Sequence, residues 1–173
     1  MAPTTNAQSL GREILESLDR EFARLHLRSR KIIESTPAEI LYLACHSDLE
    51  SPEPSSRSVG ESVLRAAAAI EQTFGGITSN LWDDPFEWTL PEFLTTPEKV
   101  LDHLEDVEAT RRRAFSSFTD DQCLRKRVAT PAQESELLIN LLLETLVRAI
   151  SFQTQGALTL KSLSGISVNG FII

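Results

Sequence analysis

Apolar side chains recur at steps of three and four residues along four long segments of the chain, a spacing typical of amphipathic α-helices. These segments run over about residues 7–35, 58–81, 96–118 and 130–165. On the first of them, the side chains expected to face inward are Leu10, Ile14, Leu18, Phe22, Leu25, Ser29 and Ile32. No segment alternates apolar and polar residues at the period of two that marks a half-buried strand. The sequence therefore predicts an all-α protein, a four-helix bundle with short extra helical turns in its connections.

Residues that commonly begin or end helices lie at the borders of these segments. Ser58 and Glu61 have the spacing of a capping box at the start of the second segment. The other expected borders are Pro37, which ends the first helix and begins a short turn, Thr96 with Pro97 after it, Thr130 or Ser135 before the last helix, and Gly165. The pair Gly75–Gly76 is a weak point that could bend the second helix.

Length and composition fit one domain. The 173 residues are 41% hydrophobic and 24% charged, which suffices for one buried core. We expect the bundle to span about residues 7–165, with the apolar tail 166–173 packed back on it or on a neighbouring chain. The net charge of −8 disfavours a protein that wraps nucleic acid. The most apolar stretch, residues 137–152, is interrupted by polar side chains, so we interpret it as a buried helix, not a membrane span.

The first residues, MAPTTNAQSLGRE, contain no apolar stretch of the kind that a secretory signal needs. We therefore expect a cytoplasmic protein. Cys45 and Cys123 form no CxxC motif and are expected to be reduced thiols in that compartment.

Three stretches, in this order, resemble the DinB/YfiT-like family of helical bundles. They are SVGESVLR at 58–65, FEWTLPEF at 86–93 running into TPEKVL at 96–101, and the last helix with its ending LKSLSG at 160–165. The resemblance covers about residues 10–165. It implies a four-helix bundle, often dimeric, with a divalent metal held by one histidine on the second helix and two on the last. Some relatives transfer or isomerise thiol adducts, and many have no known activity.

The chain departs from that pattern at every ligand position. Arg65 stands where the resemblance implies the first histidine. The histidine pair of the last helix falls, depending on the register, on Ala149 and Gln153 or on Arg148 and Phe152. A guanidinium stays protonated and has no lone pair for a metal. We therefore expect no metal and no cofactor in this chain.

The three histidines and the cysteine beside one of them are the remaining candidates for chemistry. His26, His46 and His103 lie on separate elements without HxxxH spacing, so we interpret them as packing or surface residues, with His103 on an outward face. A metal site built from them is the alternative. Cys45 next to His46 would suit a nucleophile and its base, but neighbouring side chains usually point apart. We assign no catalytic residue.

Arg65 and Arg148 interrupt otherwise apolar helix faces. One interpretation pairs them with nearby carboxylates, namely Glu61, Glu71 or Glu144. The other is a pocket for a small anion, because arginine binds carboxylates and phosphates with two parallel hydrogen bonds. Candidate ligand-binding residues are then Arg65, Arg148, Gln153 and Gln155.

Two further groups of residues have a structural interpretation. The aromatic connection from Trp82 to Phe93 is expected to pack as a lid on the bundle, or alternatively to wall a ligand cleft. The basic runs Arg111–Arg113 and Arg125–Arg127 are expected to face solvent, although the helical spacing also places Arg111 on the inner face of the third helix.

These observations predict a bundle without the metal site of the family, which binds a small ligand or self-associates and has no catalytic role. One alternative is a thiol-dependent transferase or hydrolase that uses Arg65 without a metal. A second is a structural or regulatory dimer without a pocket. We expect a homodimer, because the last helix carries more apolar surface than one bundle core needs.

Overall fold

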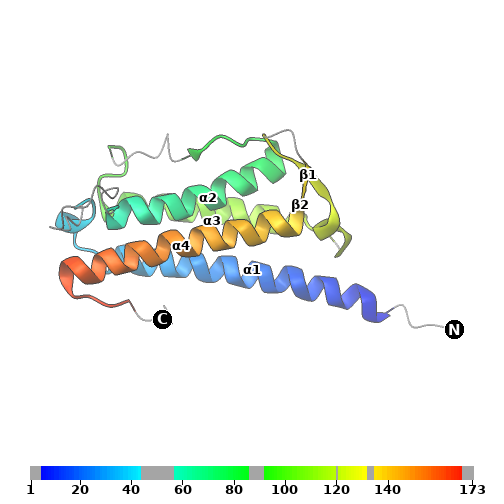
Figure 1. Cartoon of the computed structure of the whole chain (residues 1–173), viewed down its shortest axis with the longest axis horizontal. Helices are drawn as coiled ribbons and strands as arrows, with labels where there is room; N and C mark the ends of the chain where they lie inside the picture. The colour runs from blue at the N-terminus through cyan, green and yellow to red at the C-terminus, as the bar shows by residue number, and fades with distance from the viewer. Residues whose placement is uncertain (1–4, 44–56, 86–91, 120, 132–134, 169–173) are drawn as a thin grey trace, which may run out of the picture.

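A computed structural model describes residues 5–43, 57–85, 92–119, 121–131 and 135–168, and it confirms the all-α bundle. Its four long helices are α1 (Thr5–Glu34), α2 (Val59–Ser79), α3 (Pro97–Ser117) and α4 (Leu138–Ser164) (Figure 1). Short 3-10 turns, η1 (Ala38–Ile40) and η3 (Asp121–Arg125), follow α1 and α3. No helix in the described ranges combines the length and the apolar character that crossing a membrane requires.

The direction of the helices sets the layout of the bundle. α1 and α4 run one way and α2 and α3 the other (Figure 1). Both α1 and α2 contact α3 and α4, so the order around the bundle is α1, α3, α2, α4. Tyr42 shows that α2 and α3 start at the same end of the bundle. Its ring packs beside Gly60 in the first turn of α2, and its hydroxyl donates to the carbonyl of Leu94, shortly before α3. α2 is therefore antiparallel to α4 and parallel to α3.

Parallel neighbours require a long connection. At a rise of 1.5 Å per residue, a helix of the length of α2 is about 30 Å long, and the chain must travel back that far before α3 begins. Residues 80–96 make this return, and the structure describes them on either side of 86–91. The return begins at Asn80, which ends α2 in the left-handed conformation (φ 53°) and donates its N–H to the carbonyls of Gly75 and Gly76.

Small side chains let α2 approach α4 closely. The run Ala66–Ala69 is buried, as its composition suggests. A Cβ at Gly156 of α4 would lie 3.2 Å from the Cβ of Ser62 on α2. The two helices therefore approach so closely there that a side chain at position 156 would crowd α2. Where α1, α2 and α3 meet, larger rings fill the core. Phe22 and Phe74 lie edge to face at 5.1 Å between ring centroids, and Phe115 packs against both.

The helix ends follow the sequence in most places. The Ser58 hydroxyl accepts from the N–H of Glu61, the Thr96 hydroxyl accepts from the N–H of Lys99, and Gly165 caps α4 at φ 71°. The 3-10 turn η1 follows Pro37 as expected. α2 continues through Gly75 and Gly76 to Ser79.

The start of the last helix was predicted too early. α4 begins at Leu138, because the residues before it form a two-stranded antiparallel ribbon of β1 (Arg127–Ala129) and β2 (Ser135–Leu137). In the ribbon, Val128 lies opposite Glu136. Strands of three residues are too short to show an alternating pattern, which is why the sequence did not reveal them.

One inward position on α1 was also wrong. Ile14 is 44% exposed, and Leu15 (7%) takes the buried place next to Leu18. Positions three and four residues before Leu18 flank the same face of a helix. Which of them is buried depends on the neighbouring helices: Leu15 lies near Phe115 of α3, and Ile14 borders a groove beside α4.

Arg111 is buried, which agrees with its place on the inner face of the third helix and contradicts the expectation that the whole run Arg111–Arg113 faces solvent. It is 3% exposed, and two of its nitrogens donate to the Glu108 carboxylate at 2.7 and 2.8 Å, while a third donates to Asp19 of α1. Burial disfavours the charge on Glu108, but the hydrogen bonds from Arg111 and Arg112 outweigh it and lower the pKa of Glu108. This cluster joins α3 to α1.

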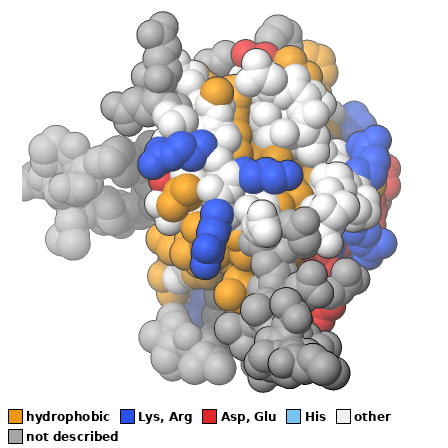
Figure 2. All heavy atoms as spheres, turned by 90° about the vertical axis from the view of Figure 1, so that its right-hand side faces the viewer, with side chains coloured by type: hydrophobic (Ala, Val, Ile, Leu, Met, Phe, Trp, Pro, Cys, Tyr) orange, Lys and Arg blue, Asp and Glu red, His pale blue; other side chains and the backbone are white. Residues whose placement is uncertain are grey.

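The other basic residues behave as expected. Arg112, Arg113 and the run Arg125–Arg127 are exposed. Figure 2 shows the end of the bundle near the ribbon, where lysine and arginine side chains lie beside exposed hydrophobic ones. Val168 of the C-terminal tail is half-buried against the core, and residues 169–173 lie outside the described ranges.

We expect Gly76→Ala to destabilise the protein, because a Cβ there would lie 2.4 Å from the indole of Trp82. The clash should lower the free energy of unfolding by about 1–3 kcal/mol, outweighing the better helix propensity of alanine. The matched control is Gly75→Ala, whose Cβ would meet only the carbonyl oxygen of Leu81, at 3.2 Å. Urea unfolding of both variants measures the difference, and equal stabilities would contradict this account of how the return segment is anchored.

Candidate functional site

The four residues that the sequence predicted as a ligand site do not surround one site. Gln153 is fully buried and faces α1, where its side-chain amide donates to the carbonyl of Leu25 at 2.6 Å and to the hydroxyl of Ser29 at 2.7 Å. It therefore links α4 to α1. Its own carbonyl oxygen, Oε1, is buried without a hydrogen-bond partner among the described residues.

Arg65 of α2 and Gln155 of α4 lie where these two helices meet. The Nε of Arg65 is 3.3 Å from Oε1 of Glu61, which confirms the interpretation that pairs Arg65 with a carboxylate. Glu61 also lies 3.8 Å from Nε of Arg57, and Arg57 donates to Oε1 of Gln155 at 3.1 Å. The guanidinium of Arg57 covers the ring of Phe152. Arg65 and Gln155 thus belong to a surface network that α2 and α4 satisfy between them.

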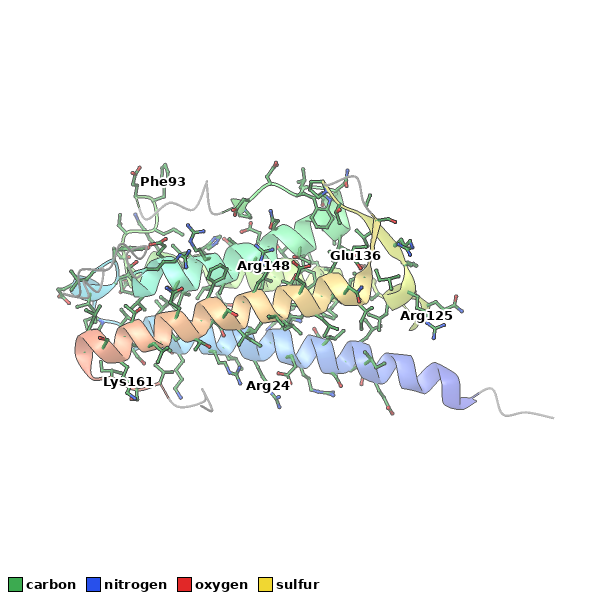
Figure 3. The ribbon with its side chains drawn as sticks, in the orientation of Figure 1. Arg24, Phe93, Arg125, Glu136, Arg148 and Lys161 are labelled. Atoms are coloured by element: carbon green, nitrogen blue, oxygen red, sulfur yellow. The ribbon has the colours of Figure 1, made fainter. Side chains whose placement is uncertain are left out.

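Arg148 is exposed on α4 (Figure 3). Of the two residue pairs matched to the family histidines, Ala149 and Gln153 lie in the core, and Phe152 is half-buried beneath Arg57. Within the described ranges, no group of three or more His, Cys, Asp or Glu residues is arranged to hold a metal ion.

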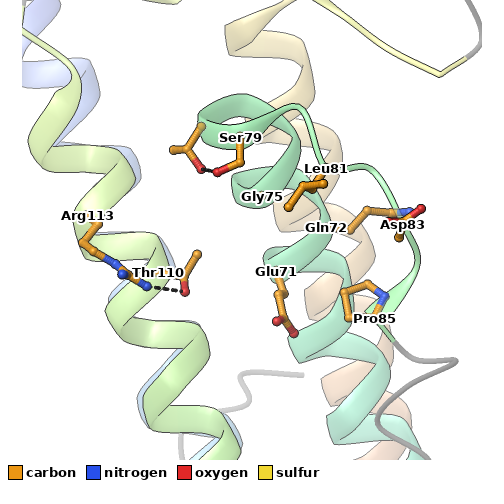
Figure 4. Close-up of a pocket in the computed structure, with 10 residues that line it drawn as sticks. Glu71, Gln72, Gly75, Ser79, Leu81, Asp83, Pro85, Thr110 and Arg113 are labelled. Carbon is orange, nitrogen blue, oxygen red and sulfur yellow. Dashed lines mark hydrogen bonds between the residues drawn. The ribbon is translucent and has the colours of Figure 1, made fainter.

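A pocket of about 700 Å³ lies on the opposite side of α2, a volume in the range of natural small-molecule sites. α2 forms its floor with Glu71, Gln72 and Gly75 (Figure 4). α3 forms one wall with Thr110 and Arg113, and the beginning of the return segment, residues 81–85, forms the other.

The wall made by residues 81–85 is tied to α2. The amide of Gln72 donates to the carbonyl of Trp82 at 2.9 Å, and the Trp82 indole lies on Gly76 and donates to Oδ1 of Asn80. Because Gly75 carries no side chain, the floor between the two walls stays open. Of the connection from Trp82 to Phe93, Asp83 and Pro85 line this pocket, and the alternative that the connection walls a ligand cleft stays a prediction.

The rest of the aromatic connection gives a mixed result. Trp82 packs on α2 as a lid residue would, but Phe93 is 66% exposed near the start of α3 (Figure 3). Phe86 and Trp88 lie outside the described residues.

Glu71 is the unusual residue of this pocket. Its Oε2 turns into the interface with α3 and lies 3.8 Å from Nε2 of His103, too far for a hydrogen bond. Both atoms are buried, and neither has a hydrogen-bond partner among the described residues. Buried polar atoms without partners are rare in folded proteins and often mark functional sites.

His103 was expected on an outward face, and the structure contradicts this. Its side chain is 14% exposed and faces Glu71 of α2. The sequence indicated Glu71 as one of three possible partners of Arg65 and Arg148; Arg65 pairs with another of the three, Glu61. The pairing of Glu71 with His103 depends on α2 and α3 being parallel neighbours, and no local pattern in the sequence signals that.

Burial pushes both members of this pair toward their neutral forms. It raises the pKa of Glu71, and the negative charge of Asp106 raises it further. Burial lowers the pKa of His103, although Asp106 acts in the opposite direction. The carboxylate of Glu71 can accept a hydrogen bond from a molecule in the pocket or form an ion pair with a positively charged one. It can also exchange a proton with such a molecule.

The remaining candidates from the sequence lie elsewhere. His26 is mostly buried between α1 and α3, with its Nε2 3.5 Å from Glu105, in agreement with a packing role. Cys123 is buried in η3. Cys45 and His46 lie outside the described residues, so the nucleophile hypothesis for them stays a prediction.

Comparison with known proteins gives no match: no family model, no curated protein and no solved structure is significantly similar to this chain. The resemblance to DinB/YfiT-like bundles therefore stays a prediction.

We expect Glu71→Gln to raise the free energy of unfolding at pH 7. The pKa of Glu71 in the folded protein lies above its ordinary value of 4.5, so ionisation costs stability as the pH rises through and above that value. The neutral amide removes this cost, and the gain should shrink at pH 4, where the carboxyl group is largely protonated in both states. Urea unfolding at the two pH values measures it. Glu61→Gln on the same helix is the control and should show no gain at pH 7; a loss of stability in Glu71→Gln at pH 7 would refute the prediction.

Proposed function

We propose that this protein binds a small polar molecule in the pocket between α2, α3 and residues 81–85, and that binding is its role. One observation carries the proposal. Three buried side-chain atoms lack a hydrogen-bond partner among the described residues, and two of them, Oε2 of Glu71 and Nε2 of His103, lie 3.8 Å apart between α2 and α3; Glu71 also lines the pocket. Polar groups left unsatisfied beside an open pocket are what a ligand site requires.

This proposal moves the ligand away from the residues that the sequence suggested. Arg65 pairs with Glu61, and Gln153 holds α4 to α1, so both have structural roles. A metal-independent transferase that uses Arg65 would first have to break its contact with Glu61. The structure offers no observation that favours that alternative.

Filling the pocket tests the proposal. We expect small polar fragments to bind the parent protein in ligand-observed NMR, and to bind Gly75→Leu at least tenfold more weakly, because the added side chain occupies the floor of the pocket. Ala109→Leu adds the same side chain to an exposed position on α3 and should leave binding unchanged. Thermal melts establish that both variants are folded. Fragments that bind all three proteins equally would show that the pocket is not the site.

Self-association is a second proposal, favoured by an apolar stripe along α4. Leu143, Val147, Ile150 and Leu158 are between 42% and 64% exposed, and the first three are separated by four and then three residues. This spacing is typical of helices that pack against a second helix. Ile14 of α1 extends the stripe across a groove that Leu143 and Leu146 also line. Contiguous exposed apolar surface of this kind marks interfaces, and we propose that a second copy of the chain covers it.

Substitution in the stripe tests this proposal. Val147→Glu places a charge in the middle of the stripe and should convert a dimer into a monomer in light scattering at micromolar concentration, because the charge would be buried without a partner. Arg148→Glu introduces the same side chain at the next residue, about 100° around the helix, and should leave the dimer intact. A parent protein that is already monomeric would sink the proposal.

A further inference from the structure

The charges around the pocket differ from those elsewhere in the bundle. Two carboxylates face it, Glu71 from the floor and Asp83 from residues 81–85 (Figure 4). A third, Asp106 on α3, acts on Glu71 through its charge. Among the described residues that line the pocket, Arg113 alone carries a guanidinium; it is exposed and donates to the hydroxyl of Thr110. The surroundings of Glu71 are therefore negative.

Glu71 also differs from three other glutamates of the helices. Glu61, Glu105 and Glu108 each have an arginine within salt-bridge distance. Among the described residues, the ion-pair partner of Glu71 is His103 alone, at 3.8 Å, and burial disfavours the charged form of that imidazole. Arg57 and Arg65 lie on the opposite side of α2, where both are within salt-bridge distance of Glu61. Glu71 thus faces the pocket without a strong cation of its own.

We propose that the molecule bound in this pocket carries a positively charged nitrogen, and that this nitrogen pairs with the carboxylate of Glu71. The inference rests on the proposed function and names the chemical class of its ligand: a small organic amine. An ammonium group would supply the charge-assisted hydrogen bonds that the protein does not supply to this carboxylate. The open floor at Gly75, with Leu81 and Pro85 beside it, leaves room for an apolar body attached to the nitrogen.

Other ligand classes fit less well. Among the described lining residues, a small anion would meet two carboxylates, on the floor and wall of the pocket, and a single exposed arginine. A divalent metal needs several donors that converge on one point, and Glu71 and Asp83 stand on separate elements, α2 and the return segment.

Three probes on one scaffold separate these classes: 2-phenylethylamine, 2-phenylethanol and 3-phenylpropionate, which are cationic, neutral and anionic at pH 7.5. NMR titration of the full-length protein should show the amine binding at least tenfold more tightly than the alcohol, and the carboxylate more weakly still. Magnesium chloride at millimolar concentration should not displace the amine.

Glu71→Gln should weaken binding of the amine at least tenfold and change binding of the alcohol less than twofold, because it removes the charge and keeps the shape. Glu61→Gln, on the same helix but outside the pocket, is the matched control and should bind like the parent. His103→Gln should keep the preference for the amine.

The outcomes distinguish this inference from the proposal on which it rests. If the alcohol or the carboxylate binds as well as the amine, or Glu71→Gln keeps the full preference, the ligand class is wrong, while loss of fragment binding in Gly75→Leu still supports the pocket. If magnesium displaces the amine, the site prefers a metal ion and the inference also fails. If no probe binds and Gly75→Leu changes nothing, both the ligand class and the proposed function are refuted.

Discussion

The parallel run of α2 and α3 is the constraint on which the rest of this structure depends. Helices that run the same way cannot be joined by a tight turn, so the chain must return outside the bundle, and its first residues lie along α2. Trp82 rests on Gly76 and fixes that return segment in place. The pocket follows from this layout, because α2, α3 and residues 81–85 become its floor and two walls.

The polar groups between the helices divide into two kinds. Arg111 with Glu108 and Asp19 satisfies buried charge between α3 and α1, and Gln153 bonds to α1 from α4. Such contacts fix how the helices pack and leave little to offer a ligand. Glu71 and His103 face each other across α2 and α3 without closing a hydrogen bond. Among the described residues, buried polar atoms without a hydrogen-bond partner therefore remain at Glu71 and His103, between α2 and α3, and at Oε1 of Gln153.

Much of the fold could be read from local patterns. The helix starts at Ser58 and Thr96 and the glycine cap at Gly165 were predicted because capping depends on a few adjacent residues. The errors share a different origin. Leu15 instead of Ile14, and the buried rather than solvated Arg111, depend on which helix lies opposite. The three-residue strands of the ribbon depend on pairing between segments and leave no period of their own.

The sequence by itself determined that the chain forms four amphipathic helices, since the spacing of apolar side chains, helix caps and breakers all act over one or two turns. It also determined that the last helix has apolar residues beyond one face, which the exposed stripe of α4 reflects. Only the tertiary structure decided that α2 and α3 lie side by side in the same direction. Residues 32 positions apart, Glu71 and His103, meet for that reason, and contacts between helices obey packing over the whole bundle and not a local pattern.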